Sequence, residues 1–466
     1  MPRGVHDRAQ ISLLHLAWPI FVENILRTSV MSVDTLMLSR YSEKAVAAMS
    51  LVNQFAFFMQ LLYMTVSTGA SILIAQNLGA GRRRNAGLVG VASLALVVAF
   101  SIVVSAVFAV GTGPLIGLYD LDPEVAHYGR QFLALYGGLS FFMALNTAQA
   151  SILRAWGYTR DPMLFNVLCL VVTVIGDALC LFGPFGLPVL GVTGVAASTV
   201  LGQAVACGLA ALAIHRRRDL ALPMRELARI PRRLYREILA IGVPTAGENI
   251  SYNLSQIAIM AMLSTLGATP LATYGILLAV LRYVFMPGVS IGTGAQIKVG
   301  YLVGAGRHDE AKRRVYRYFA LAVACSLTGV LLVQLLHRPL LALFSDDPDI
   351  VALASTVLIV AIVYEPGRNF NTVIIPALKG AGDVRFPVYV GTVSIWCVGV
   401  AGAWLFGIRL GGGLAAVWIA MAADEWLRGL VMFLRWRSGV WQRYARLAAA
   451  GADVAEVSAL EISAGI

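Results

Sequence analysis

The chain has 466 residues, of which 58% are hydrophobic and 13% are charged, whereas soluble domains carry about 25% charged residues. This composition excludes an ordinary soluble protein and indicates a helix bundle surrounded by membrane lipid. The net charge of +11 does not indicate a nucleic acid partner, because the basic residues lie in loops between apolar runs. The five cysteines are scattered and lack the spacing of a metal site.

Twelve apolar runs follow one another, each long enough for a transmembrane helix. They lack the period-two alternation of barrel strands, so the sequence predicts an all-α polytopic membrane protein. The expected spans cover residues 11–38, 46–76, 87–110, 127–153, 163–185, 190–214, 238–265, 271–302, 315–337, 349–378, 386–409 and 413–435. Basic loops follow the even-numbered spans, and loops on the opposite side are acidic or neutral, which predicts that both termini are cytoplasmic.

The chain also contains an internal repeat. With an offset of 225 residues, Pro19 aligns with Pro244, and loop residues 79–82 align with 304–307. Because each half has an even number of helices, both copies enter the membrane in the same direction, as in transporters with two rocking lobes. The sequence therefore predicts two pseudo-symmetric six-helix lobes. The expected parts are an N-lobe at 1–214, a basic cytoplasmic linker at 215–237, a C-lobe at 238–436 and a weakly ordered cytoplasmic tail at 437–466.

Four segments carry a family resemblance. VSTGASILIAQNLGAGR at 66–82, LRAWGYTRDPMLFN at 153–166, its copy LKGAGDVRFPVYVG at 378–391 and GVTGVAAST at 191–199 resemble the multidrug and toxic compound extrusion (MATE) family. The resemblance implies a V-shaped pair of six-helix lobes. It also implies export of organic cations and other amphiphiles in exchange for protons or sodium ions, with no further cofactor.

The resemblance implies an ion-coupling site in the N-lobe. Asp34 and Asp177 match acids that family members carry in spans 1 and 5. Thr173 stands where one subgroup has an asparagine, and it keeps a hydroxyl group there. Thr199 in span 6 is a further candidate oxygen ligand. Two carboxylates and hydroxyl groups can hold a proton or a sodium ion, and no other metal site is expected.

A second subgroup places its acids in the C-lobe, so the sequence leaves the coupling lobe open. Glu248 in span 7 and Glu365 in span 10 lie at comparable depth. Glu365 opens the stretch EPGRNFN, where Pro366 and Gly367 are expected to break the helix. The structural alternative for Glu365 is a clamp with Arg368 three residues later.

Other intramembrane charges have simpler expected roles. Arg27 lies one helical turn after Glu23 and is its expected partner. A local network is expected between the charged residues of span 12, and Lys298 is expected to reach the membrane surface. The residues of span 12 are Asp424, Glu425 and Arg428.

The expected substrate cavity combines repeated polar residues with aromatic and methionine side chains. Such side chains suit flat organic cations through cation–π and sulfur contacts. The candidates are Glu23, Asn24, Asn249, Asn146, Asn371, Tyr63, Met64 and Tyr283.

These features predict a cation-coupled antiporter that works by alternating access, as a monomer in a bacterial inner membrane. The alternative is a flippase for lipid-linked precursors, whose pyrophosphate would need a cationic cavity. We expect the charged residues inside the cavity to be mainly acidic, which favours the antiporter. We expect no enzymatic activity, because no Walker loop or catalytic triad pattern is visible.

Overall fold

The computed structural model describes residues 10–117, 119, 121–186, 188–217, 219–220 and 222–450, apart from the side chains at 30–32, 34, 35, 185, 228 and 446–450. The described residues are almost wholly helical, and none of them lies in a strand. They fall into two compact units. The N unit comprises Val22–Leu78 and Arg82–Val243, and the C unit comprises Met1–Phe21, Gly79–Gly81 and Pro244–Ile466.

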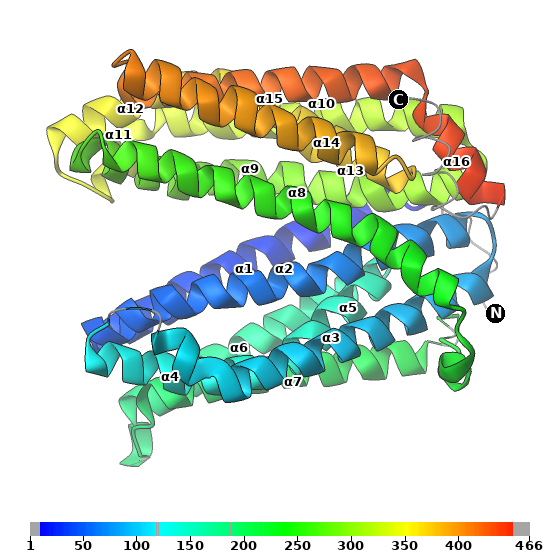
Figure 1. The fold of residues 1–466 in the computed structure, drawn as a ribbon, viewed down its shortest axis with the longest axis horizontal. Helices are drawn as coiled ribbons and strands as arrows, with labels where there is room; N and C mark the ends of the chain where they lie inside the picture. The colour runs from blue at the N-terminus through cyan, green and yellow to red at the C-terminus, as the bar shows by residue number, and fades with distance from the viewer. Residues whose placement is uncertain are drawn as a thin grey trace. The chain divides into compact units, whose positions relative to one another are not determined.

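The N unit packs its helices in one bundle, in which α6 lies along α7, α4 and α5 pack on α7, and α3 packs on α4 and α5 (Figure 1). Its helices are α1 (Leu13–Tyr41), of which the part up to Phe21 belongs to the C unit, α2 (Glu43–Gly79), α3 (Arg83–Gly117), α4 (Pro123–Gly138), α5 (Phe141–Ala155), α6 (Arg160–Phe182) and α7 (Gly191–Arg216). The fourth predicted span is thus made of two helices, α4 and α5.

In the C unit, α12 lies against α15, and α10 packs on both α9 and α12 (Figure 1). The elements are α8 (Arg232–Ser264), of which the part up to Val243 belongs to the N unit, α9 (Ala268–Gly304), α10 (His308–Leu335), α11 (His337–Ala342), α12 (Pro348–Asn369), α13 (Ile375–Gly380), α14 (Arg385–Ser394), α15 (Gly413–Ser438) and α16 (Trp441–Ala450). The last two predicted spans before α15 contain π-helical segments, at Phe370–Ile374, Ile395–Val400 and Ala403–Arg409.

Each of the twelve predicted spans falls on helix. Eight helices among the described residues are long and apolar enough to cross a membrane by length and composition. Of the remaining four predicted spans, three carry intramembrane charges: Glu23 in α1, Glu248 in α8 and Arg428 in α15.

The repeated loops owe their sequence to backbone geometry. Gly81 and Gly306 have φ of 74° and 72°, and the repeat-related Gly157 and Gly382 have φ of 88° and 98°. These left-handed values cost other residues free energy, so glycine is favoured where each helix ends. The outer ends repeat as well, since Asp122 and its repeat partner Asp347 each cap a helix that begins with proline.

The helix is not broken at Pro366, so the position predicted for the break is wrong. α12 continues through Pro366 to Asn369, and the π-helical segment Phe370–Ile374 follows it. Gly367 allows the close approach of Trp426, because a Cβ atom there would lie 2.6 Å from the indole ring. The helix therefore stays continuous around the proline, and the irregular turn comes one turn later.

Lys298 was expected at the membrane surface, but its side chain is fully buried in the C unit. Its Nζ donates a hydrogen bond of 2.6 Å to the backbone carbonyl of Ile11.

The first residues of the tail are helical, whereas the whole tail was expected to be weakly ordered. Trp441 begins helix α16 and stacks on Trp436 at 4.2 Å, whereas residues 451–466 lie outside the described part of the chain.

The basic linker is attached to the N unit. Arg217 donates a 2.6 Å hydrogen bond to Asp161 of α6, and Arg84 of α3 pairs with Glu226 at 3.0 Å. Glu226 lies in a short 3-10 segment, Met224–Arg229.

Candidate functional site

Glu23 in α1 is held by two other helices of the N unit. Arg154 at the end of α5 donates to both carboxylate oxygens of Glu23 at 3.0 and 3.1 Å. The side-chain amide of Asn166 in α6 donates to the same carboxylate at 3.1 Å. Arg27, the partner expected from helix spacing, has an exposed side chain. The expected pair is therefore wrong, because a partner from a neighbouring helix replaces the local one.

The C unit repeats this pair. Glu248 in α8 lies 225 residues after Glu23, and Lys379 in α13 lies 225 residues after Arg154. Lys379 Nζ donates to Glu248 Oε2 at 2.6 Å. A glycine, Gly391, occupies the position that corresponds to Asn166, so the carboxylate of Glu248 receives no amide from that position. Both halves thus tie their first helix to the end of their fourth span through a carboxylate and a base.

A charged network without an N-lobe counterpart lies beside the Glu248 pair. Arg428 in α15 contacts Asp424 at 3.1 Å and Glu425 at 2.9 Å, which confirms the network expected in span 12. Ser394 donates to Asp424 at 2.5 Å, and the amide of Asn371 donates to the Glu425 carboxylate at 2.5 Å. The hydrogen bonds from Ser394 and Asn371 reduce the free-energy cost of burying these two carboxylates.

Glu365 forms the expected clamp with Arg368. Its side chain is 1% exposed, and Arg368 Nη1 lies 3.4 Å from its carboxylate. The guanidinium of Arg368 also lies over the ring of Phe285 in α9, 3.5 Å from the ring centroid. The stacking fixes the plane of the guanidinium at the point where the π-helical segment begins.

Several of these C-unit groups line a cavity of about 210 Å³ inside the C unit. Its wall includes the acids Glu248 and Glu425 and the bases Arg368, Lys379 and Arg428. The expectation that acids predominate is therefore wrong for this cavity. Of the residues predicted for ion coupling or substrate, the wall contains Glu248, Asn249 and Asn371.

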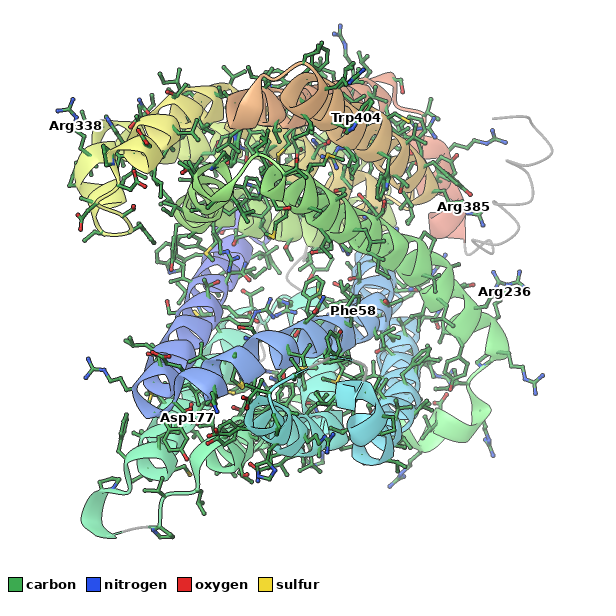
Figure 2. The ribbon with its side chains drawn as sticks, turned by 60° about the vertical axis from the view of Figure 1, so that its left-hand side comes forward. Phe58, Asp177, Arg236, Arg338, Arg385 and Trp404 are labelled. Atoms are coloured by element: carbon green, nitrogen blue, oxygen red, sulfur yellow. The ribbon has the colours of Figure 1, made fainter. Side chains whose placement is uncertain are left out.

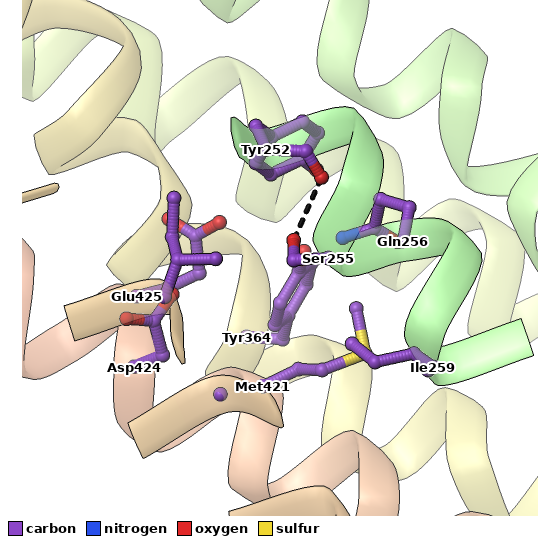
Figure 3. Close-up of a pocket in the computed structure, with 10 residues that line it drawn as sticks. Tyr252, Ser255, Gln256, Ile259, Tyr364, Met421, Asp424 and Glu425 are labelled. Atoms are coloured by element: carbon purple, nitrogen blue, oxygen red, sulfur yellow. Dashed lines mark hydrogen bonds between the residues drawn. The ribbon is translucent and has the colours of Figure 1, made fainter. Parts of the chain in front are cut away.

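A smaller cavity of about 20 Å³ lies behind the first one and has room for about one water molecule. Figure 3 shows Asp424 and Glu425 on one side of it and Tyr252 and Gln256 of α8 on the other. The hydroxyl of Ser255 donates to the backbone carbonyl of Tyr252 at 2.7 Å. Both cavities share Tyr252 and Glu425, so a polar wall extends from one to the other.

The N-lobe candidates centre on Asp177, which is labelled in Figure 2 and is 0% exposed. Thr173 lies one turn earlier in α6 and is also buried, close to Gly202 of α7. Thr199 donates its hydroxyl to the carbonyl of Val195 in its own helix. The backbone at Asp34 is helical, but its side chain lies outside the described residues.

The other predicted cavity residues are not among those that line the C-unit cavity. In the N unit, Tyr63 is buried and hydrogen-bonded to Ser140 at 2.8 Å, and Asn146 donates to Gln203 at 2.9 Å. The remaining three are Asn24, half-buried, and Met64 and Tyr283, both exposed.

Sequence reasoning missed the basic side of the cavity. The sequence predicts Arg368 only as a clamp for Glu365 and predicts no role in a cavity for Lys379. The signal was present, because the aligned N-lobe position of Lys379 is also basic and that of Glu248 is also acidic. A charge pair repeated in both halves indicates contact between the paired positions.

Comparison with known proteins places the chain in a family. The MatE family profile matches residues 19–179 and 244–405, one match in each half. The chain belongs to the MatE family. It is 36% identical over 432 residues to the uncharacterized transporter YisQ of Bacillus subtilis, covering 92% of this chain and 94% of that protein. It is 27% identical to the probable multidrug resistance protein NorM of Thermotoga maritima, covering 96% of each chain.

Solved MATE structures share the fold. An outward-facing multidrug resistance MATE transporter of the MOP superfamily has a TM-score of 0.84 at 20% identity and covers 95% of this chain and 96% of its own. A MATE structure in the bent conformation has a TM-score of 0.85 at 18% identity, with coverages of 94% and 96%. The two-lobe helical fold predicted from the sequence is confirmed.

Membership in the MatE family makes the chain a multi-pass membrane transporter, and the expectation that it is not an enzyme is confirmed by its relatives. These comparisons do not support the alternative of a flippase. This chain aligns with nearly the full length of both relatives, so the similarity covers both lobes.

Proposed function

We propose that this MatE transporter is a secondary active efflux antiporter that exports amphiphilic organic solutes, cations among them, against protons or sodium ions. Relatives named as multidrug resistance proteins support this substrate class. The coupling ion is then the sole cofactor. The antiporter works as a monomer surrounded by lipid in a bacterial inner membrane, with both termini in the cytoplasm.

The observation that carries the proposal is the complete burial of Asp177 in an apolar helix of the N unit. A carboxylate in such surroundings gains free energy when a proton or a sodium ion neutralises it. Thr173, one turn earlier, has its hydroxyl on the same face of α6. Together with Asp34, these groups form the proposed coupling site, with the oxygen of Thr199 as a further ligand.

The C-unit acids are less suited to coupling, because each already contacts a base. Glu248 pairs with Lys379, Glu365 with Arg368, and Glu425 with Arg428. A carboxylate that is neutralised by a fixed base gains less from a second cation. We therefore assign ion coupling to the N unit and keep Glu248 and Glu365 as positioning residues.

In the proposed cycle, the ion enters from outside and neutralises the N-unit acids, and the outgoing solute then leaves. The lobes next reorient towards the cytoplasm, where the ion departs and a new solute binds. The ion shifts this equilibrium only as far as it binds the two states with different affinity.

Proteoliposome transport tests the proposal, with a proton gradient and a sodium gradient imposed separately. We expect one of the two gradients to drive export of a fluorescent organic cation by the parent. Asp34→Asn is expected to transport at the rate measured without a gradient. Export by the parent under neither gradient would refute antiport, and full gradient-driven export by Asp34→Asn would remove Asp34 from the coupling site.

A further inference from the structure

From the C-unit cavity we infer the class of solute that this transporter recognises there: an amphiphile that carries a carboxylate or a similar single anionic group. The inference rests on the proposed export function and extends it to the chemistry of the substrate. Three bases and two acids line the cavity, and two further acids outside this lining, Glu365 and Asp424, contact Arg368 and Arg428.

Of the three bases, Arg368 has the longest contact with its partner acid. Its contact with Glu365 measures 3.4 Å, whereas Lys379 lies 2.6 Å from Glu248 and Arg428 lies 2.9 Å from Glu425. A guanidinium has five N–H donors in one plane, and this geometry matches the two oxygens of a carboxylate. Because the ring of Phe285 fixes that plane, Arg368 is pre-oriented to hold an anionic group.

Two further atoms of the wall remain without a hydrogen-bond partner among the described residues: Nε of Arg428 and Oδ1 of Asn371. Both side chains are more than nine-tenths buried. Unsatisfied polar groups inside a protein are costly, so a donor and an acceptor here favour a polar ligand group over an apolar one. The acceptor on Asn371 allows the anionic group to carry a neighbouring N–H.

The size of the cavity limits what enters it. Its volume of about 210 Å³ lies below the range of about 300–1,000 Å³ that is typical of pockets for drug-sized ligands. This space holds a head group and not a whole drug-sized molecule. The apolar part of the solute therefore lies outside the cavity.

The basic side chains are not required by the repeated fold. In the N-lobe, Met143 aligns with Arg368 at the offset of 225. In the last helix of each half the offset shortens to 219, so Leu209 aligns with Arg428. The N unit thus folds into the same kind of bundle with apolar residues at these two positions. The two arginines are therefore specific to the C unit, as expected of residues that bind a ligand.

Binding of matched dansyl probes to the purified full-length protein tests the inference. Dansylglycine ends in a carboxylate, and dansylethylenediamine ends in an ammonium group on the same fluorophore. We expect the parent to bind dansylglycine more tightly than the amine. In Arg368→Gln, we expect the affinity for dansylglycine to fall by about tenfold to a hundredfold, as for the loss of a hydrogen-bonded charge.

Arg338→Gln is the matched control, since it removes an arginine whose side chain extends from the end of the C unit (Figure 2). Its affinity for dansylglycine is expected to equal that of the parent. The double variant Glu365→Gln with Arg368→Gln removes both charges and keeps no unpaired acid, so it serves if the single variant fails to fold. It is expected to lose dansylglycine binding as well.

Equal binding of dansylglycine by the parent and by the folded Arg368 variants would overturn the inference, as would a parent that prefers the amine. Export of an organic cation under an ion gradient is measured on the same preparations. If that export persists while dansylglycine does not bind, this inference fails and the proposed antiport stands. If dansylglycine binds and no gradient drives export, the antiport fails instead.

Discussion

The two units share a carboxylate–base pair and differ in what surrounds it. In the N unit, the pair of Glu23 and Arg154 is completed by the amide of Asn166. In the C unit, the pair of Glu248 and Lys379 lies instead on a cavity with two further bases. The shared pair reflects the repeated fold, and the differences mark where each unit has acquired its own function. The predictions below separate these two kinds of residue.

The largest effect is expected from Asp177→Asn in the N unit. The amide preserves size but cannot exchange a proton or bind a sodium ion with a full charge. Gradient-driven export in proteoliposomes should fall to the rate without a gradient, while the purified variant remains folded. A matched control is Asn146→Asp, which places an acid in the same unit and should not restore coupling to Asp177→Asn.

Loss of Arg428 should destabilise the C unit strongly. In Arg428→Leu, Asp424 and Glu425 lose their common base, and a broken buried pair costs about 3–5 kcal/mol. The midpoint of thermal unfolding in detergent should fall accordingly. Arg338→Leu is the exposed control and should leave the midpoint nearly unchanged. Equal midpoints for the two variants would contradict the network.

The two repeated pairs should differ in strength. Double-mutant cycles of Glu23→Gln with Arg154→Met and of Glu248→Gln with Lys379→Met measure their coupling energies, which for contacting residues are about 0.5–3 kcal/mol. We expect the C-unit pair to have the larger value, because its contact is shorter, at 2.6 Å against 3.0 Å. A larger N-unit value would show that the Asn166 amide outweighs this difference.

The smallest effect is expected at Gly391. A Cβ atom there would lie 3.5 Å from the carboxylate of Glu248, which is an ordinary contact. Gly391→Ala should therefore raise the free energy of unfolding by about 0.4–1 kcal/mol, since alanine restricts the unfolded chain and favours helix. A loss of stability in denaturant titration would show that the space beside Glu248 must stay open.

Much of the fold was predictable because it follows from local rules. Apolar runs of membrane length predicted all twelve spans. The repeated glycines at 81, 157, 306 and 382 follow a local rule as well, since their left-handed backbone favours glycine. The irregular turn at Phe370–Ile374 was not predictable from Pro366 and Gly367, because α12 continues through both residues.

The site was less predictable, because its charges pair across helices. Helix spacing suggested Arg27 for Glu23, but tertiary packing brought Arg154 instead. Lys298 is fully buried and also has a partner that is distant in sequence, because the carbonyl of Ile11 accepts a hydrogen bond from its Nζ at 2.6 Å. The clamp of Glu365 with Arg368 and the span-12 network were predictable, because their members lie three or four residues apart on one helix.

The central claim is that the N unit couples the ion and the C unit recognises the head group of the solute. The most direct measurement compares gradient-driven export of an organic cation with dansylglycine binding in Asp177→Asn and in Arg368→Gln. The account predicts that Asp177→Asn loses the response to the gradient and keeps binding, and that Arg368→Gln does the reverse. Loss of both properties in each variant, or of neither, would contradict the division between the units.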